Sequence, residues 1–427
     1  MNELDIYYNS IKVGTLLLKP QSNDIYLNYC DTWQQNGFSL SPLLPLDRNF
    51  TNNQVKNFIE NLLPEGDGLD MLISYLQISK TNKFALISSI GRDVSGALDF
   101  IIPNSKAIET TFREVSSEEL AQRIRKRKEI PISVWDDKPR ISIAGVQEKL
   151  PITKLNGKYG FGEGKLSSTH ILKFDKKDEN LVLNEYLSLH LARVAGLNVA
   201  KAEIKYFENE QVLEVERFDR KIISDQEIQK IHVIDSCQSL CLPVSYKYER
   251  NFGSGRDVKD IREGVSFEKL QSLINRCTIP LIENKKILEW TIVNLCLGNS
   301  DAHGKNISFF KDDNGMKITP FYDIVNIALY KNDYETDLAM AINDEFNIDN
   351  IRSYDLIEFC DEISVKMNQF RIIFKKISNK IFQEFNSDFI KELRKKDKIF
   401  IDKYIINVEN RIIKIEKVVR NSLESSK

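Results

Sequence analysis

The sequence of 427 residues lacks the features of a membrane-bound or exported protein. No uninterrupted apolar run approaches the roughly 18 residues that a membrane-spanning helix needs. The N-terminus, MNELDIYYNS, has no basic region followed by an apolar stretch, which a signal peptide requires. Sixty lysines and arginines nearly balance 62 aspartates and glutamates, so no overall field attracts nucleic acid or anionic lipid. We therefore expect a soluble globular protein without a membrane partner.

Cysteine is also scarce, with six residues scattered through segments that otherwise look like core, at positions 30, 237, 241, 277, 296 and 360. Such a distribution over a long chain favours reduced thiols in the cytoplasm over a disulfide framework. Cys237 and Cys241 stand one helical turn apart, but no second Cys/His pair follows at the spacing of a zinc site. The cysteines therefore predict a cytoplasmic protein with core thiols.

The first 105 residues predict a compact α+β domain. ELDIYYNSIKVGTLLLKP and NDIYLNY alternate apolar and polar residues between turn formers, which is typical of β-hairpins. From Thr51 to about Ser89 the apolar period becomes helical, with a break at Pro64 and Gly66. ALDFIIP then predicts a strand that closes the domain near residue 105.

The rest of the chain changes from strands to helices. Between about Pro139 and Arg220, one helix, NEYLSLHLARVAG, ends at Gly196 among segments that predict strands: RISIAG, KLPITKL, HILKF, AEIKYF and VLEVERF. After about residue 235 the apolar period is almost entirely helical. A β-rich half followed by a helical half predicts an α+β bilobal fold. The expected domains are residues 1–105, 106–235 and 236–427.

One basic run, RIRKRK at 123–128, ends a helix that the S-x-x-E pattern of Ser116 and Glu119 opens. These cations suit the C-terminus of a helix, where the macrodipole favours positive charge. They also suit a phosphate-binding patch. The sequence leaves both interpretations open.

The loop SDAHGKN follows an apolar helical segment, WTIVNLCLGN, and contains four polar side chains within six positions. Asp301 and Asn306 have the D-x-x-x-x-N spacing of a protein-kinase catalytic loop. In such a loop the carboxylate accepts the proton of the acceptor hydroxyl, and the amide oxygen holds Mg²⁺ against the phosphates. A second magnesium ligand should follow a short hairpin, and Asp323 in ITPFYDI stands there among apolar neighbours. A carboxylate in such surroundings is costly unless it binds a cation.

The same reaction needs a lysine on a strand and a carboxylate on the next helix. Lys173 in HILKF and Glu185 in NEYLSLHLA fit these places, and RISIAGVQEKL fits the earlier turn that covers the phosphates. The chain lacks G-x-G-x-x-G, HRD and DFG, so the turn has only Ala144-Gly145 to let backbone approach phosphate. His303 produces D-x-H-x-x-N, which resembles phosphatidylinositol kinases and related atypical kinases.

Several segments, in this order, closely resemble the HipA family of bacterial serine/threonine kinase toxins: RISIAGVQEKL, STHILKF, NEYLSLHLARVAGLNVA, VERFDR, SDAHGKN and TPFYDI. NFIENLLPEG and SSIGRDVSGAL resemble the N-terminal segment of the same family. The resemblance covers most of the chain and is strongest from Arg140 to Ile324. It implies a bilobal, atypical protein-kinase-like fold, with an extra α+β subdomain on a β-rich N-lobe and an all-helical C-lobe.

The resemblance also implies roles for single residues. Asp301 would be the catalytic base, and His303 and Lys305 would line the γ-phosphate site. Asn306 and Asp323 would hold Mg²⁺. ATP would be bound by the phosphate turn, by the strand lysine with its helical carboxylate, and by a hinge at 216–218 whose backbone meets adenine. These ATP-binding residues would be Ala144, Gly145, Val146, Gln147, Glu148, Lys149, Lys173, Glu185, Glu216 and Phe218.

Regulation and partners follow from the same resemblance. Family members are inactivated when a serine in the RIS-x-AG-x-Q loop is phosphorylated, and Ser142 occupies that position. Nearly two negative charges in a phosphate-binding turn would repel ATP, whereas the alternative is a strand serine bonded to backbone. The expected partner is a small helix-turn-helix antitoxin (HipB-like), through which the chain would reach DNA only indirectly. The expected substrate is an aminoacyl-tRNA synthetase, phosphorylated on a serine.

Two other functions stay open. A catalytically dead kinase fold could serve as a binding module in a co-repressor, but such a module has no need to keep Lys173, Asp301, Asn306 and Asp323. A small-molecule or lipid-type kinase would also fit D-x-H-x-x-N. The absence of basic or amphipathic membrane segments argues against the lipid version.

Overall fold

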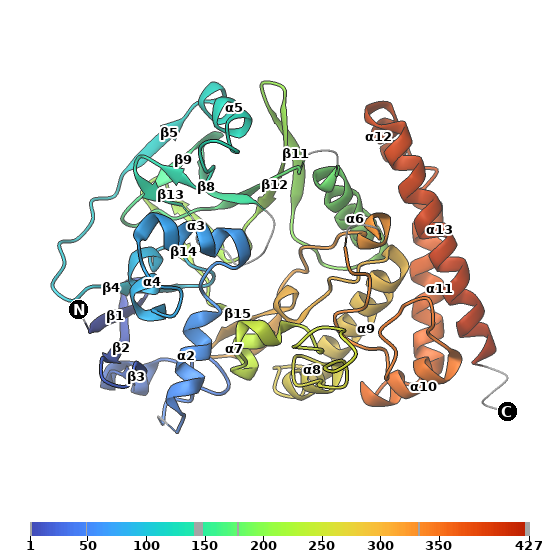
Figure 1. The fold of residues 1–427 in the computed structure, drawn as a ribbon, viewed down its shortest axis with the longest axis horizontal. Helices are drawn as coiled ribbons and strands as arrows, with labels where there is room; N and C mark the ends of the chain where they lie inside the picture. The colour runs from blue at the N-terminus through green and yellow to red at the C-terminus, as the bar shows by residue number, and fades with distance from the viewer. Residues whose placement is uncertain (1, 48, 141–147, 177–178, 332–333, 423–427) are drawn as a thin grey trace. The chain divides into compact units, whose positions relative to one another are not determined.

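The computed structural model describes residues 2–47, 49–140, 148–176, 179–331 and 334–422. The chain divides into two compact units, each built from segments that are far apart in the sequence (Figure 1). Unit 1 comprises Met1–Lys176, Lys201–Val244 and Phe309–Met316, and unit 2 comprises Lys177–Ala200, Ser245–Ser308 and Lys317–Lys427.

Unit 1 is rich in antiparallel strands. One sheet has the order β3-β2-β1-β4, a second has the order β11-β12-β10-β8-β9-β5, and β6-β7 and β13-β14 are separate hairpins. The elements of its first half are β1 (Glu3–Tyr8), β2 (Ile11–Lys19), β3 (Asp24–Tyr29), α1 (Asp31–Asn36), α2 (Asn52–Glu60), α3 (Gly66–Leu76), α4 (Lys83–Ile90), β4 (Leu98–Ile101), β5 (Phe112–Val115), α5 (Ser117–Arg125), β6 (Val134–Trp135) and β7 (Lys138–Pro139). Those of its second half are β8 (Lys149–Leu155), β9 (Lys158–Gly162), β10 (His170–Phe174), β11 (Ala202–Phe207), β12 (Glu210–Glu216), β13 (Arg220–Ser224), β14 (Glu227–Lys230), β15 (Val233–Asp235) and α7 (Ser236–Leu240).

The strands of unit 1 follow the alternation of their side chains. In β1, Leu4 and Ile6 are buried on one face, as the period of two predicts for a half-buried strand. In the second sheet, side chains of β8, β10 and β12 form one core with Leu120 and Ile124 of α5. The hairpins and strands predicted from these segments are confirmed, except that most of RISIAG lies outside the described residues.

The basic run 123–128, which begins on α5 and continues past its end, is largely engaged in the packing of unit 1. Arg123 lies over the Trp135 ring at 4.7 Å, Arg125 pairs with Glu208 at 2.9 Å, and Arg127 donates to the Asp175 carbonyl at 2.6 Å. Lys126 and Lys128 are exposed. The three arginines therefore have structural partners, and only the two lysines remain for a phosphate patch.

One half of the predicted capping box is present at the N-terminus of α5. The Ser116 hydroxyl accepts a hydrogen bond from the Glu119 N–H. The Glu119 carboxylate does not return to the backbone of Ser116, because it pairs with Arg113 at 2.6 Å. A stronger charged partner has replaced the second half of the capping box.

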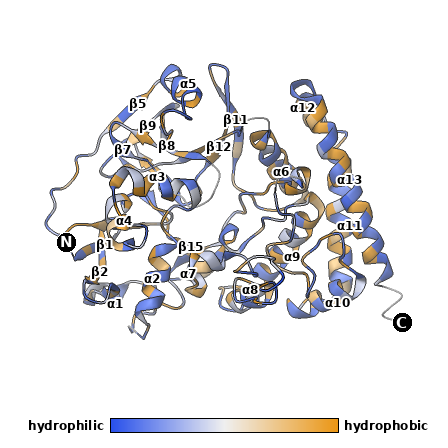
Figure 2. Ribbon diagram, viewed as in Figure 1, coloured by the Kyte–Doolittle hydropathy of each residue, from blue (hydrophilic) through white to orange (hydrophobic). Residues whose placement is uncertain are grey.

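Unit 2 is mainly helical. Its elements are α6 (Leu181–Ala195), α8 (Phe267–Ile274), α9 (Pro280–Leu297), α10 (Ser353–Glu362), α11 (Met367–Glu384), α12 (Asp388–Lys396) and α13 (Lys398–Asn421), with short 3₁₀ helices η1 (Val244–Lys247), η2 (Gly304–Asn306) and η3 (Ile327–Tyr330). Figure 2 shows hydrophilic and hydrophobic residues alternating along α13, as expected for a helix with one buried face. The predicted end of α6 is confirmed, since Gly196 follows it with a φ of 117°.

The chain after residue 235 is not entirely helical. Strands β16 (Ser308–Asp312) and β17 (Gly315–Ile318) form a hairpin that extends β15 in the order β15-β16-β17. The expectation of an all-helical C-terminal lobe therefore missed two strands, although a short hairpin between Asn306 and Asp323 was predicted and is confirmed. Within the described ranges, no helix is long and apolar enough to cross a bilayer.

Candidate active site

The predicted site residues fall in both units. Unit 2 contains the SDAHGKN loop (residues 300–306), Asp323 and Glu185. Unit 1 contains Glu148, Lys149, Lys173, Glu216 and Phe218. Ser142, Ala144, Gly145, Val146 and Gln147 lie outside the described residues.

A glycine directs the chain from the buried helix α9 into the SDAHGKN loop. Gly298 caps α9 with a φ of 72°, a left-handed conformation that costs glycine little. Its N–H donates to the Asn294 carbonyl, and the Asn299 side-chain amide donates to Asn294 Oδ1 at 2.8 Å. The Gly298 N–H and the Asn299 amide nitrogen are thus bonded locally, and the chain turns sharply just before Asp301.

Local hydrogen bonds within the SDAHGKN loop fix its shape. The His303 N–H donates to the Asp301 carbonyl, and the Asn306 N–H donates to the His303 carbonyl, both at 2.9 Å. The Asn306 side-chain amide also donates to the Asp301 carbonyl at 2.9 Å. His303, Lys305 and Asn306 are buried, whereas Asp301 is partly exposed. The loop therefore holds a carboxylate at the surface of a turn and fixes the nitrogen of Asn306, which leaves its amide oxygen as a candidate cation ligand.

The segment that contains Asp323 is tied to the same loop. The Tyr322 hydroxyl donates to the Lys305 carbonyl at 2.7 Å and lies 2.6 Å from Ser308 Oγ. Asp323 has a φ of 57°, a left-handed conformation that costs a residue other than glycine roughly 1–2 kcal/mol. Strain of this kind often accompanies a functional position.

The donors present fit a magnesium ion better than a transition metal. Asn306 and Asp323 offer amide and carboxylate oxygens, and Mg²⁺ prefers oxygen ligands, one or two from the protein with others from phosphates and water. Among the residues that the structure describes, no three His, Cys, Asp or Glu side chains group as a metal site.

Glu185 lies on α6 and is 1% exposed. The preceding residue, Asn184, donates to the Asn326 carbonyl at 3.1 Å and accepts from the Asn326 N–H at 2.8 Å. These bonds attach α6 to the segment just after Asp323 within unit 2. The pairing of Glu185 with Lys173 remains a prediction.

In unit 1, two lysines stand opposite each other on adjacent strands. Lys173 of β10 pairs in register with Lys149 of β8, so both side chains project on the same face of the sheet. Lys173 is 7% exposed. Two ammonium groups on one face of a sheet are suited to binding an anion such as a polyphosphate. Glu148 pairs instead with Arg127 at 3.2 Å.

The VERFDR segment forms a buried charge network. Arg217 donates to both carboxylate oxygens of Asp219 at 2.8 and 2.9 Å, and Arg220 lies 2.9 Å from the same carboxylate. Although burial raises the pKa of Asp219, Arg217 and Arg220 hold it well below its ordinary value. The two arginines also bond to the Val94 carbonyl and to Asp93. This motif therefore connects the SSIGRDVSGAL segment to the second sheet within unit 1.

The predicted adenine hinge overlaps this network. The N–H groups of Glu216 and Arg217 donate to the carbonyls of Lys201 and Thr169, at 2.8 and 2.9 Å. The Phe218 ring packs edge-on against Phe310, with 5.9 Å between centroids. Adenine contacts through residues 216–218 would therefore have to use groups other than these two N–H groups, such as the carbonyl oxygens of the segment.

Sequence reasoning missed two tyrosines of unit 2. Tyr322 stands beside Asp323 in the quoted segment TPFYDI, so its position was visible but its contact with Lys305 was not. Tyr248 lies in SYKYER, which no motif distinguishes, and its hydroxyl donates to Asp301 Oδ1 at 2.6 Å. Only the tertiary structure reveals this second contact.

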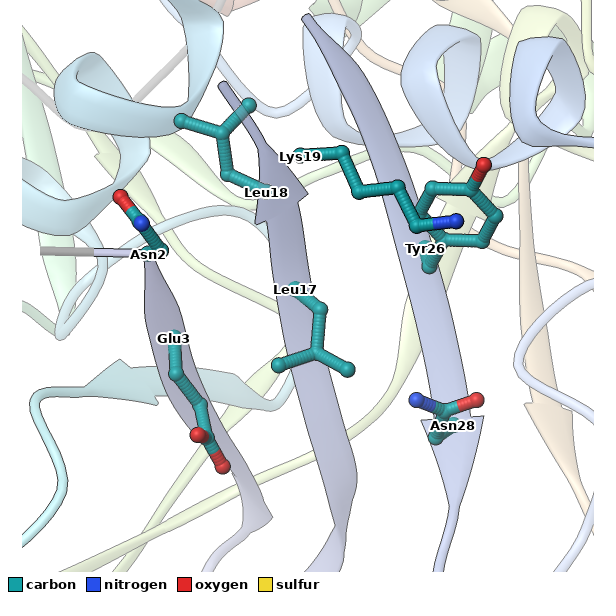
Figure 3. Close-up of a pocket in the computed structure, with 7 residues that line it drawn as sticks. All are labelled: Asn2, Glu3, Leu17, Leu18, Lys19, Tyr26 and Asn28. Carbon is teal, nitrogen blue, oxygen red and sulfur yellow. The ribbon is translucent and has the colours of Figure 1, made fainter. Parts of the chain in front are cut away.

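A hollow of about 570 Å³ lies on the first sheet of unit 1, over β1, β2 and β3 (Figure 3). The Lys19 ammonium lies 4.4 Å from the centre of the Tyr26 ring, and Glu3 is the other charged residue of the lining. The lining contains none of the predicted site residues: it consists of Asn2, Glu3, Leu17, Leu18, Lys19, Tyr26 and Asn28. One lysine beside one glutamate is a poor match for a triphosphate.

Two family models match this chain, each over a different part of the sequence. Residues 4–101 match the family model of the HipA N-terminal domain, and residues 141–385 match that of the HipA-like C-terminal domain. A serine/threonine-protein kinase toxin, HipA, from Shewanella oneidensis is 46% identical over 366 residues, which cover 86% of this chain and 84% of that protein.

A solved structure of a HipA protein also matches this chain. The chain is similar to HipA from Shewanella oneidensis MR-1, solved in complex with HipB and operator DNA, with a TM-score of 0.89 and 42% identity. The match covers 98% of this chain and 99% of that one. The α+β, bilobal kinase-like fold class expected from the sequence is thereby confirmed. The chain belongs to the HipA family of serine/threonine-protein kinases.

Proposed function

We propose that this protein is a toxin kinase that transfers the γ-phosphoryl group of ATP to a serine hydroxyl of a protein. One observation carries the proposal: Asp301 and Asn306 are joined by a 2.9 Å hydrogen bond within a single tight loop. A carboxylate and an amide oxygen held together in this way match the base and the metal ligand of phosphoryl transfer.

Each site residue then has a chemical task. Asp301 accepts the proton of the serine hydroxyl while the serine oxygen forms a bond to the γ-phosphorus. The bond from that phosphorus to the β,γ-bridging oxygen breaks, and ADP leaves with the electron pair. Lys149 and Lys173 neutralise phosphate charge, as do the buried His303 and Lys305 at the γ-phosphate.

Asn306 and Asp323 would hold Mg²⁺, which supplies charge neutralisation at the phosphates when it is bound. Glu185 orients Lys173, and the 216–218 segment meets adenine. The phosphate turn, from Ala144 through Lys149, covers the nucleotide. These assignments rest on the family resemblance together with the residue chemistry described above.

The partners are proposed from the relatives. A HipA complex with HipB and operator DNA supports a HipB-like helix-turn-helix antitoxin for this chain, with DNA reached only through that partner. The substrate proposed is an aminoacyl-tRNA synthetase. Phosphorylation of Ser142 would limit the activity, because a dianionic group in the phosphate turn repels ATP.

The test uses Mg²⁺, γ-labelled ATP and a bacterial lysate depleted of its own kinases. Asp301→Asn should lower the initial rate of label transfer roughly 10²–10⁴-fold, the usual contribution of a general base. Asp388→Asn is the matched control, because Asp388 is 95% exposed on α12. A labelled lysate protein and labelled Ser142, mapped by mass spectrometry, should both be absent with Asp301→Asn.

Several results would contradict the proposal. Wild-type activity in a folded Asp301→Asn variant would exclude Asp301 as the base. Transfer only to small molecules would favour the small-molecule kinase, and no transfer by protein whose intact mass shows no phosphate would favour the binding module. Label that persists on another residue of a Ser142→Ala variant would contradict the role of Ser142.

A further inference from the structure

Tyr248 contacts the proposed catalytic base from a distant part of unit 2. Its hydroxyl donates to Asp301 Oδ1 at 2.6 Å, although the two residues are 53 positions apart. Its ring also packs edge-on against the His303 imidazole, with 5.1 Å between centroids and an interplanar angle of 89°. One tyrosine therefore supports two polar residues of the SDAHGKN loop.

The segment around Tyr248 is firmly anchored. The next residue, Glu249, is 2% exposed, and its carboxylate accepts from Arg262 Nε at 2.7 Å and from the Ala341 N–H at 2.8 Å. The Glu249 N–H donates to the Ala339 carbonyl at 2.9 Å. Arg262 also pairs with Asp344. A buried carboxylate with these partners fixes the backbone on which Tyr248 stands.

The same anchor contacts the SDAHGKN loop. The Ala339 N–H donates to the carbonyl of Ser300, the residue before Asp301, at 2.9 Å. Ala339 thus bonds to both backbones, through its carbonyl to Glu249 and through its N–H to Ser300. The separation of Tyr248 and Asp301 is therefore set by main-chain hydrogen bonds and does not depend on side-chain packing alone.

We propose that Tyr248 is a positioning residue for Asp301. The Tyr248 hydroxyl holds Asp301 Oδ1 and thereby presents Asp301 Oδ2 to the serine hydroxyl of the substrate. The inference rests on the proposed function of Asp301 as the base. The serine proton then moves to Oδ2 as the oxygen–phosphorus bond forms and ADP departs. Without the phenol, the carboxylate can rotate about χ2, so fewer molecules have an oxygen aligned with the incoming hydroxyl.

The decisive variant is Tyr248→Phe, which keeps the ring against His303 and removes only the hydroxyl. Tyr246→Phe is the matched control, because Tyr246 lies two residues before Tyr248 and its hydroxyl bonds to Glu263 and not to Asp301. Initial rates of label transfer to the lysate protein are measured over a range of ATP concentrations, below the melting temperature of every variant. Asp301→Asn is assayed in parallel.

Tyr248→Phe should lower the maximal rate roughly 10-fold or more, as expected when a hydrogen bond to a charged group is lost. The ATP concentration for half-maximal rate should stay within about twofold of the wild-type value, because holding Asp301 in place acts on the base and leaves the nucleotide contacts unchanged. Tyr246→Phe should behave as the wild type. Glu249→Gln should reproduce part of the loss, since it loosens the anchor without touching Asp301.

Two outcomes would overturn the inference. Either an unchanged maximal rate in Tyr248→Phe, or a loss that appears only in the half-maximal ATP concentration, would show that Tyr248 does not position the base. An active Asp301→Asn variant would instead refute the proposed function itself, whatever Tyr248 does. If Tyr248→Phe has a lower melting temperature than the wild type, rates are expressed per folded molecule. The maximal rates of the two proteins can then still be compared.

Discussion

Each unit contains a segment dense with charged and polar side chains, and the two segments satisfy those side chains differently. In unit 1, Arg217, Asp219 and Arg220 bond to one another and to the backbone near Val94. In unit 2, backbone hydrogen bonds join residues of the SDAHGKN loop to one another and to Ala339, and a tyrosine contacts the carboxylate of Asp301.

The comparison separates architecture from chemistry. A buried charge set whose members neutralise one another has little capacity left for a substrate. A loop fixed through its main chain can keep side chains for a ligand. Both segments are equally distinctive as sequence motifs. Their bonding shows that VERFDR joins parts of unit 1, and it is compatible with the catalytic role that we propose for SDAHGKN.

The largest expected effect comes from breaking the unit 1 network. Asp219→Asn should destabilise unit 1 by up to about 3–5 kcal/mol, because it removes the nearer of the two carboxylates that both buried arginines contact, the other being Asp93. Thermal unfolding checks this against Asp225→Asn, a control at an exposed position of the neighbouring turn. Equal melting temperatures for the two variants would show that the network is not what holds this segment.

A smaller effect is expected at Gly264, which packs against the segment of Tyr248. A Cβ there would lie 1.7 Å from the Tyr248 carbonyl oxygen, so the backbone must shift. Gly264→Ala should cost about 1–3 kcal/mol of stability and also lower phosphotransfer per folded molecule. The control is Gly255→Ala, where the nearest atom is 3.6 Å away. Full activity in Gly264→Ala would weaken the link between this segment and Asp301.

The smallest effect concerns Glu362 of unit 2. Burial and the nearby Glu249 raise its pKa from 4.5 to about 7, against the opposing influence of a backbone N–H and Arg262. The folded state therefore binds this proton more tightly than the unfolded chain, and stability falls as pH rises from about 4.5 to 7.

Glu362→Gln should remove that dependence. Its melting temperature relative to the wild type should be higher at pH 8 than at pH 5, by at most about 3 °C because the Glu362 side chain is only partly buried. Melting curves at several pH values measure the difference. A difference that is constant with pH would show that Glu362 does not titrate in this range.

Much of the local structure could be predicted from the sequence. The alternation in β1, the helical period and final glycine of α6, and the hairpin between Asn306 and Asp323 are all short-range signals. The ordered series of kinase motifs also identified the family. The strands β16 and β17 were not placed beside β15, because that pairing joins segments about 75 residues apart.

The sequence by itself determined which side chains are available for chemistry, since motif spacing and apolar periodicity are local properties of the chain. The tertiary structure decided which of them act together. The contact of Tyr248 with Asp301, the network of Arg217 with Asp219 and Val94, and the engagement of the α5 arginines all join distant segments. Such partners depend on how sheets and helices pack, because burial leaves each charge to bond with whichever group folding brings near.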